Sequence, residues 1–358
     1  MLSPLIEGLL RAADESGASD LILHRGKIPQ ARVNGELIAV DSPPVDADDL
    51  DRLWAHCQAP AGATDFDAGL TSATGTRFRV NLLHQLGARA AVLRRIRSQV
   101  PEMATLGLPA ELLKTWAARR SGIVLVCGPT GSGKSTTVAS LLDWINSESA
   151  RHIVTIEDPV EFVFTPRRAT FTQREVGIDT PTFAEGLRRS LRQSPDVIFL
   201  GEIRDGESAA TALQAAETGH LVFATLHAAN SSDMLARLEL LFTPEERETL
   251  RNTLAGQLIG VLCQRLLPAL DGQPALVVEF FTNSGLSRKI LASGRASELT
   301  DFIARADPKD AQSFATSLLG LIRSGRVVES VAIENADNPQ EIQRALRGVA
   351  SSNTLNRR

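Results

Sequence analysis

The sequence contains no tyrosine, and aromatic residues make up only 4% of it. Positive charge is not in excess either, because 38 lysines and arginines stand against 42 aspartates and glutamates. A protein that moves along single-stranded nucleic acid usually combines a basic channel with aromatic side chains on which bases stack. The composition therefore disfavours a nucleic-acid translocase, and we expect no nucleic-acid partner.

Cysteine is also scarce. The three cysteines, Cys57, Cys127 and Cys263, lie far apart and include no C-x-x-C pair. This spacing disfavours both a disulfide framework and a zinc site. We therefore expect reduced thiols that are buried as small apolar side chains.

Long apolar segments are missing as well, since no apolar run reaches 18 residues. The N-terminal stretch MLSPLIEGLLRAADESG has acidic residues and lacks the basic start of a signal peptide. We expect a cytoplasmic protein with no direct membrane insertion, one that reaches the inner membrane peripherally and through partners.

The N-terminal part of the sequence predicts a small α+β domain. Its apolar residues recur first at helical spacing and then in short runs typical of strands. Asn34-Gly35 stands between two such runs and is typical of a type I′ hairpin. The expected elements are a helix over 3–16, a strand over 21–23, the hairpin, a helix over 46–58, and strands in TRFRVNLLHQ and RAAVLRRI.

The rest of the chain alternates apolar runs with helical stretches, as in a mostly parallel sheet covered by helices. The runs are GIVLVCG, RHIVTI, DVIFLG and HLVFATLH. From residue 231 onward helical periodicity dominates, with amphipathic runs at 244–269 and 311–323. The expected division is a domain over 1–97, a linker over 98–109, an α/β core with C-terminal helices over 110–348, and a polar tail over 349–358.

A glycine-rich loop, GPTGSGKS, lies between the strand GIVLVC and a helix. In this context glycines let backbone N–H groups surround phosphates, Lys134 reaches the β- and γ-phosphates, and the Ser135 hydroxyl ligates Mg²⁺. The motif predicts ATP and Mg²⁺ as ligands. The expected nucleotide-binding residues are Gly128, Pro129, Thr130, Gly131, Ser132, Gly133, Lys134, Ser135 and Thr136.

Acidic residues follow two of the predicted strands. RHIVTI runs into Glu157-Asp158-Pro159-Val160-Glu161, and VIFL runs into Gly201-Glu202. ATP hydrolysis needs one acid near the metal and another that activates water, and strand carboxyl ends are where such sites form. Either group could instead cap a helix or form an ion pair. The residues alone leave the assignment among these acids open.

Arginines and histidines offer further candidates. Arg77, Arg79 and Arg94 lie in two strand-like runs, while Arg188 and Arg192 are four residues apart on one face of a predicted helix. Such arginines either compensate phosphate charge, often from a neighbouring subunit, or form solvated ion pairs. Two histidines, His220 and His227, flank the strand LVFATL and are either packing residues or members of the site.

Five motifs in order resemble the secretion and type IV pilus motor ATPases, specifically their short, retraction-type (PilT-like) members. The motifs are GPTGSGKSTT, TIEDPVEF, QREVGIDT, LRQSPDVIFLGEIRD and AAETGHLVFATLH. They span about residues 120–230, and SDLILH and RFRVN extend the resemblance toward the N-terminus. The resemblance implies an α/β protein with an N-terminal PAS-like α+β domain, followed by a RecA-like P-loop ATPase core with a helical C-terminal extension.

The same resemblance implies residue roles. Glu161 would be the general base, and Glu202 would act through Mg²⁺-bound water. His227 would lie near the γ-phosphate as a sensor. The five arginines match the family's positions, so we expect some of them to contact phosphate.

The implied function is a hexameric ATPase motor that powers pilus retraction, or twitching motility, by acting on an inner-membrane platform protein. One departure concerns the A-I-R-N-L-I-R-E helix of retraction members, because residues 285–292 read GLSRKILA and lose the expected arginines and glutamate. Alternatives are therefore a pilus assembly ATPase or a type II or type IV secretion ATPase. A regulatory module that binds ATP without turnover is disfavoured by the presence of Lys134, Glu161 and Glu202.

Overall fold

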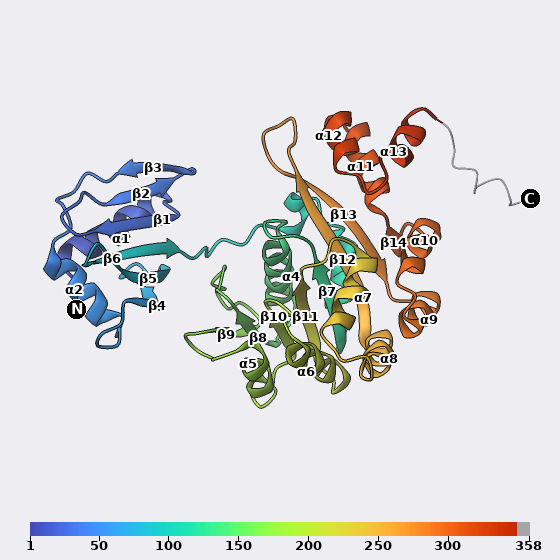
Figure 1. The fold of residues 1–358 in the computed structure, drawn as a ribbon, viewed down its shortest axis with the longest axis horizontal. Helices are drawn as coiled ribbons and strands as arrows, with labels where there is room; N and C mark the ends of the chain where they lie inside the picture. Colours follow the sequence, from blue (N-terminus) through green and yellow to red (C-terminus); the bar gives the residue numbers. More distant parts are fainter. Residues whose placement is uncertain (349–358) are drawn as a thin grey trace, which may run out of the picture. The chain divides into compact units, whose positions relative to one another are not determined.

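The computed structural model describes residues 1–348, so the predicted tail at 349–358 lies outside the described residues (Figure 1). Contacts divide the chain into two compact units. Unit 1 comprises Met1–Gln99, Pro159–Thr165 and Arg174–Pro181, and unit 2 comprises the other described residues, up to residue 348. This division differs from the expected one in the two later segments, which group with the N-terminal residues. The boundaries expected at 97 and 109 stay predictions.

Unit 1 is built on a six-stranded antiparallel sheet with the order β3-β2-β1-β6-β5-β4 (Figure 1). It agrees with the expected α+β domain. Its elements are α1 (Pro4–Ser16), β1 (Asp20–His24), β2 (Gln30–Val33), β3 (Glu36–Ala39), α2 (Ala47–His56), β4 (Asp65–Thr71), β5 (Arg77–Gln85) and β6 (Ala88–Arg95).

Local sequence explains these elements. The Ser3 side chain accepts the Ile6 N–H and so caps α1, and Gly17 ends the helix at a φ of 70°. The β2–β3 hairpin turns at Asn34 and Gly35, whose φ angles of 51° and 89° are both positive, as the type I′ prediction requires. In β5, buried and half-buried residues alternate, which gives the strand one core face and one outer face.

Unit 2 is built on an eight-stranded sheet with the order β14-β13-β12-β7-β11-β10-β8-β9, in which β9 runs into a segment of unit 1. Strands β12, β7, β11, β10 and β8 are parallel, so their carboxyl ends meet at one edge. The strands are β7 (Gly122–Cys127), β8 (His152–Glu157), β9 (Thr170–Glu175), β10 (Val197–Leu200), β11 (Leu221–Leu226), β12 (Leu258–Leu267), β13 (Ala275–Thr282) and β14 (Ala311–Gln312).

Helices accompany this sheet and form the C-terminal part of the described chain (Figure 1). Every residue of β7, β10 and β11 is buried, which explains why these strands read as continuous apolar runs. The helices are η1 (Met103–Leu106), α3 (Ala110–Ala117), α4 (Lys134–Glu148), α5 (Phe183–Ser190), α6 (Gly206–Glu217), α7 (Ser231–Leu240), α8 (Arg247–Gln257), α9 (Gly285–Ser293), α10 (Ser297–Arg305), α11 (Phe314–Arg323), α12 (Glu329–Glu334) and α13 (Pro339–Leu346).

The helical run expected at 244–269 is wrong in its second half. Helix α8 ends at Gln257, and Leu258–Leu267 forms strand β12 beside β7. Nearly all of β12 is buried, so the run has apolar residues on both faces and no period that distinguishes strand from helix. Gly260 permits this placement, because a side chain there would collide with the Trp116 ring. The antiparallel strand β13 was not expected either.

The three cysteines are free and buried, which confirms the prediction for the thiols. Within residues 1–348, no helix combines the length and the apolar character that a membrane span requires.

Candidate active site

The predicted phosphate loop connects β7 to α4. Gly128, Gly131 and Gly133 have φ angles of 151°, 78° and 85°, which L-residues with a side chain rarely adopt. A Cβ on Gly128 would collide with the Gln264 carbonyl oxygen. The loop therefore folds back tightly over β12 and leads into the N-terminus of α4, where N–H groups and the helix dipole favour phosphate.

Polar side chains of the loop fit a bound polyphosphate. The Lys134 side chain is buried, and its Nζ donates to the carbonyl oxygens of Gly128 at 2.9 Å and Pro129 at 3.0 Å. The buried Ser132 hydroxyl has no hydrogen-bond partner. Ser135 and Thr136 lie half-buried in the first turn of α4. A held ammonium and an unpartnered hydroxyl within a glycine cradle suit the oxygens of a nucleotide.

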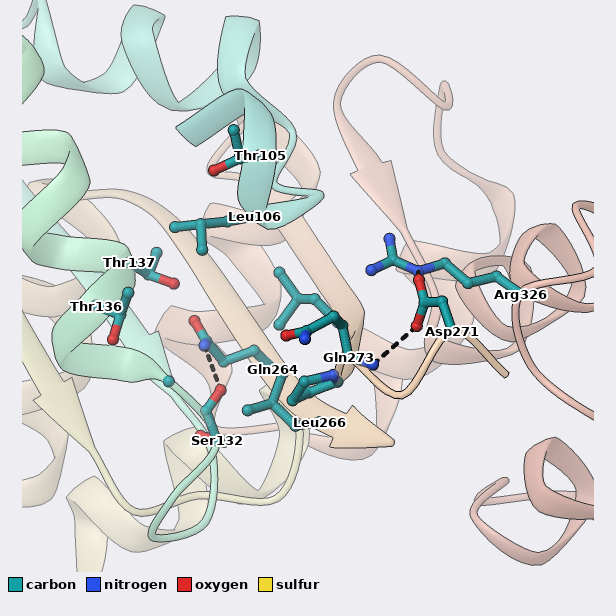
Figure 2. Close-up of a pocket in the computed structure, with 13 residues that line it drawn as sticks. Thr105, Leu106, Ser132, Thr136, Thr137, Gln264, Leu266, Asp271, Gln273 and Arg326 are labelled. Carbon is teal, nitrogen blue, oxygen red and sulfur yellow. Dashed lines mark hydrogen bonds and ion pairs between the residues drawn. The ribbon is translucent and has the colours of Figure 1, made fainter. Parts of the chain in front are cut away.

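A cavity of about 350 Å³ opens next to this loop (Figure 2). The first turn of α4 borders it on one side, and Asp271 and Arg326 border it on the other. Apolar and polar side chains share its wall, and its volume is in the range of small-molecule sites. Its lining includes Thr105, Leu106, Thr137, Gln264, Leu266 and Gln273. The sequence did not predict this cavity, because its walls come from segments that are far apart in the chain.

A carboxylate cluster forms at the ends of β8, β10 and β11. Glu202 accepts from Arg204 Nε at 2.7 Å and lies 3.0 Å from His227 Nε2. Arg204 also donates through Nη1 to Asp158 at 2.8 Å. These ion pairs, the hydrogen bond to Glu202 first, raise the pKa of the Arg204 guanidinium. Glu202, Asp158 and His227 were predicted as site candidates from the sequence, whereas Arg204 was not, although it lies within the motif GEIRD.

Gly201 makes this cluster possible. Its N–H donates to the Ile156 carbonyl at 2.7 Å, and a Cβ here would lie 3.1 Å from that oxygen and 3.2 Å from Glu157 Cα. A larger residue at this position would therefore press against the end of β8 and require its backbone to shift by a few tenths of an ångström. The approach of β10 to the end of β8 brings Glu202 near the acids that follow β8.

His227 shares the electrostatic environment of the phosphate loop. Burial lowers the pKa of its imidazole, and the positive charge of Lys134 lowers it further, while the Glu202 carboxylate opposes both. At neutral pH the imidazole is therefore uncharged and able to hydrogen bond with Glu202. The structure thus brings together Lys134, Glu202 and His227, three residues that the sequence predicted. His220 is not part of this group of residues. Its Nδ1 lies 2.9 Å from the Ala215 carbonyl oxygen, so the side chain contacts the neighbouring end of α6.

The acids after β8 are distributed between the units. Glu157 is buried and accepts from Thr155 Oγ1 at 2.7 Å. Glu161 is exposed and lies in segment 159–165, which groups with unit 1, whereas Glu202 belongs to unit 2. The Glu161 carbonyl accepts the Arg97 N–H at 3.3 Å. The role of Glu161 as general base stays a prediction.

Glu175 holds the segment that carries Glu161. Its carboxylate accepts the Val160 N–H at 3.2 Å and lies 4.0 Å from Arg79 Nε. Burial raises the pKa of Glu175, and the hydrogen bond from Val160 and the charges of Arg79 and Arg77 partly oppose that effect. Glu175 was part of the motif QREVGIDT but was not predicted as a functional residue. Nothing in the neighbouring sequence indicates that its carboxylate accepts a hydrogen bond from another segment.

The predicted arginines of unit 1 have protein partners. Arg79 pairs with Asp67 at 3.3 Å, and Arg94 pairs with Asp20 at 2.8 Å. Arg77 donates to Thr71 Oγ1 at 3.3 Å. They lie on β5 and β6. Their predicted contact with phosphate remains to be tested.

The other two arginines lie near α5. Arg188 forms an ion pair with Glu207. The expectation that Arg188 and Arg192 share one helix face is wrong, because α5 ends at Ser190 and Arg192 lies beyond it. After Ser190 the chain forms a turn in which the Arg192 N–H donates to the Arg189 carbonyl at 3.2 Å, and Ser194, with a φ of 52°, and Pro195 follow before β10.

Comparison with known proteins identifies the family. The family model described as "Type II/IV secretion system protein" matches residues 58–343. The type IV pilus retraction ATPase PilT of Pseudomonas aeruginosa is 36% identical over 94% of this chain and 99% of its own length. A crystal structure of the pilus retraction motor PilT with bound ADP superposes with a TM-score of 0.86 at 37% identity, covering 96% of this chain and all of the other.

A second solved structure, the Legionella pneumophila ATPase DotB, has a TM-score of 0.81 at 27% identity and covers 98% of this chain and 97% of its own. These similarities agree with the expected PAS-like domain and RecA-like core. The chain belongs to the type II/IV secretion system protein family and is a PilT-like ATPase.

Proposed function

We propose that this chain hydrolyses MgATP to power type IV pilus retraction, acting as a ring of six copies on an inner-membrane platform protein. The observation that carries the proposal is the contact between Glu202 and His227 within the electrostatic influence of Lys134. Full-length similarity to a pilus retraction ATPase supports the cellular role. The protein would lie in the cytoplasm, next to the inner membrane through that partner.

The chemistry assigns a role to each part of the site. Loop N–H groups and Lys134 would bind the phosphates of ATP, and the neighbouring cavity would seat the nucleoside. Ser135, and Glu202 through water, would hold Mg²⁺, which neutralises charge on the phosphate oxygens when bound. Glu161 would take a proton from the attacking water as the bond between the γ-phosphorus and its bridging oxygen breaks. His227 would sense the γ-phosphate.

Charge compensation would come from arginines. As the bridging bond breaks, negative charge grows on the leaving oxygen, and a guanidinium placed there stabilises it. The candidates are Arg77, Arg79, Arg94, Arg188 and Arg192. If some act on a neighbouring copy, turnover depends on assembly.

The biochemical test uses Glu161→Gln. We expect this variant to bind MgATP and to stop releasing phosphate, because glutamine keeps the shape of the side chain and cannot accept the proton. Hydrolysis at the parental rate would indicate that the general base is Glu202 or Glu157 instead. Addition of DNA or RNA is the matched test for a translocase, and we expect it to leave the rate unchanged.

The cellular test is deletion in the source organism followed by a count of surface pili. Excess pili would indicate retraction, and loss of pili would indicate assembly. A defect in protein export with normal pili would favour a secretion ATPase, the alternative that the description of the family and the altered sequence of α9 support.

A further inference from the structure

Arg265 lies on β12, next to the strand that leads into the phosphate loop. Its side chain is 19% exposed and has several partners. Nη2 donates to the Ala229 carbonyl at 3.2 Å and to Asp337 at 2.8 Å, and Nη1 donates to the Asn335 carbonyl at 3.1 Å. The guanidinium also lies 4.1 Å from the centroid of the Phe314 ring. One side chain therefore joins segments that are far apart in the chain.

The first of these segments is the loop over residues 227–231, which follows β11. It begins with His227, and Ala229 is only two residues later. Two charged side chains hold its backbone: Arg265 binds the Ala229 carbonyl, and buried Glu279 of β13 accepts the Ser231 N–H at 2.8 Å. Both ends of Ala229–Ser231 are therefore bonded to side chains of the sheet, and the Ala229 N–H also donates to Asp233 at 2.7 Å, so the backbone is fixed two residues after His227.

The second segment is C-terminal. Asn335 follows α12, Asp337 precedes α13, and Phe314 begins α11. A guanidinium offers several N–H donors in a rigid planar fork, so it can bind separate acceptors at once without changing its shape. A displacement of the loop at 227–231 would shift Arg265 and, with it, the turns that connect these helices.

We propose that Arg265 is a positioning residue for His227 and that it couples the histidine loop to helices α11–α13. Through this contact the C-terminal helices influence ATP turnover. The proposal rests on the role proposed above for His227. It assigns a function to an arginine in the strand that was expected to be a helix.

The test compares Arg265→Lys, Asp337→Asn and the double variant with the parent. Lysine keeps the charge and loses the fork, and Asp337 is half-exposed, so the single variants should fold. Lysine cannot keep the separate hydrogen bonds to Ala229, Asn335 and Asp337 at once, so we expect Arg265→Lys to lower kcat about tenfold or more. We expect Asp337→Asn to lower kcat about threefold, with KM for ATP nearly constant in both. Both substitutions disrupt the same contact, the one between Arg265 and Asp337. The kcat of the double variant should therefore be no lower than that of Arg265→Lys.

Controls separate positioning from loss of folding and from failure of the proposed function. Arg295→Ala breaks a C-terminal ion pair with Glu298 and should keep the parental kcat. Rates are divided by the number of sites that bind a fluorescent ATP analogue, so unfolded protein does not lower kcat. Hydrogen exchange at residues 227–231 should speed up in Arg265→Lys.

Three results decide the matter. A kcat for Arg265→Lys within twofold of the parent, with His227→Ala slowed, would overturn this inference and leave the proposed function intact. Multiplicative effects of Arg265→Lys and Asp337→Asn would also overturn it. No phosphate release from the parent would instead count against the proposed function.

Discussion

Glu202 and Glu175 both lie at strand ends, but their carboxylates have different partners. Glu202 is 20% exposed and contacts the side chains of Arg204 and His227 at the edge where the parallel strands end. Glu175 is 6% exposed, lies 4.0 Å from Arg79 Nε and, unlike Glu202, also accepts a backbone N–H from another segment. A carboxylate that contacts only side chains can give up these partners when a ligand binds. A carboxylate that accepts a backbone N–H holds that segment of the chain in place. Glu202 is therefore available for chemistry, whereas Glu175 holds two segments of the chain together.

The largest effect is expected for Glu202→Gln. If Glu202 serves the reaction, its loss should lower kcat about 100-fold or more, as removal of a preorganised charge at an active site commonly does. The free energy of unfolding should change by less than about 1 kcal/mol, because the ion pairs of Glu202 are partly solvated. Phosphate release and urea denaturation measure the two quantities. A large loss of stability would show that Glu202, like Glu175, has a structural role.

Glu175→Ala should show the opposite pattern. It leaves the buried Val160 N–H without an acceptor, which costs about 1–3 kcal/mol in the free energy of unfolding. Glu175→Gln is the matched control, since its amide oxygen can still accept that N–H and should recover most of the loss. Equal stability of the parent and the alanine variant would contradict the structural role of Glu175.

Arg79→Ala tests the arginine that contacts Glu175. We expect nucleotide binding to stay nearly intact and turnover to fall about tenfold, as for lost charge compensation at phosphate. Binding is followed by titration and turnover by phosphate release. An unchanged ATPase rate would leave Arg79 as a partner of Asp67 and Glu175 alone.

The structural role of Glu175 should also give a smaller effect, a dependence of stability on pH. The pKa of Glu175 is raised above its ordinary value of 4.5 in the folded state, so the folded protein binds its proton more tightly than the unfolded chain. This contribution to stability is present below pH 4.5 and is lost as the pH rises from 4.5 through the raised pKa. The parent should therefore lose stability relative to Glu175→Gln over that interval. Parallel curves in urea denaturation would contradict this.

The smallest effect is expected for Arg94→Ala. The Arg94 side chain is 71% exposed, and exposed ion pairs contribute about 0.2–1 kcal/mol. The free energy of unfolding should therefore change by no more than about 1 kcal/mol. A larger change would show that the outer face of this sheet is less solvated than its exposure indicates.

Much of the fold and part of the site could be predicted from the sequence, for local reasons. The glycines of the phosphate loop and the Asn34-Gly35 turn each require a backbone conformation that few other residues adopt. Strand β12 was missed because a strand buried on both faces has no period. Glu175 and Arg265 were missed because their partners, Val160 and Ala229, are backbone groups of distant segments that no side-chain pattern marks.

The bonds of Lys134 to the Gly128 and Pro129 carbonyls have a consequence for repeated cycles. A buried ammonium that lost all its acceptors would pay a desolvation penalty of several kcal/mol, and product departure would be slow for that reason. Here the ammonium can exchange phosphate oxygens for carbonyl oxygens of its own loop. When the product leaves, the ammonium then exchanges one set of acceptors for another. The Lys134 charge stays hydrogen bonded to the loop until the next nucleotide binds.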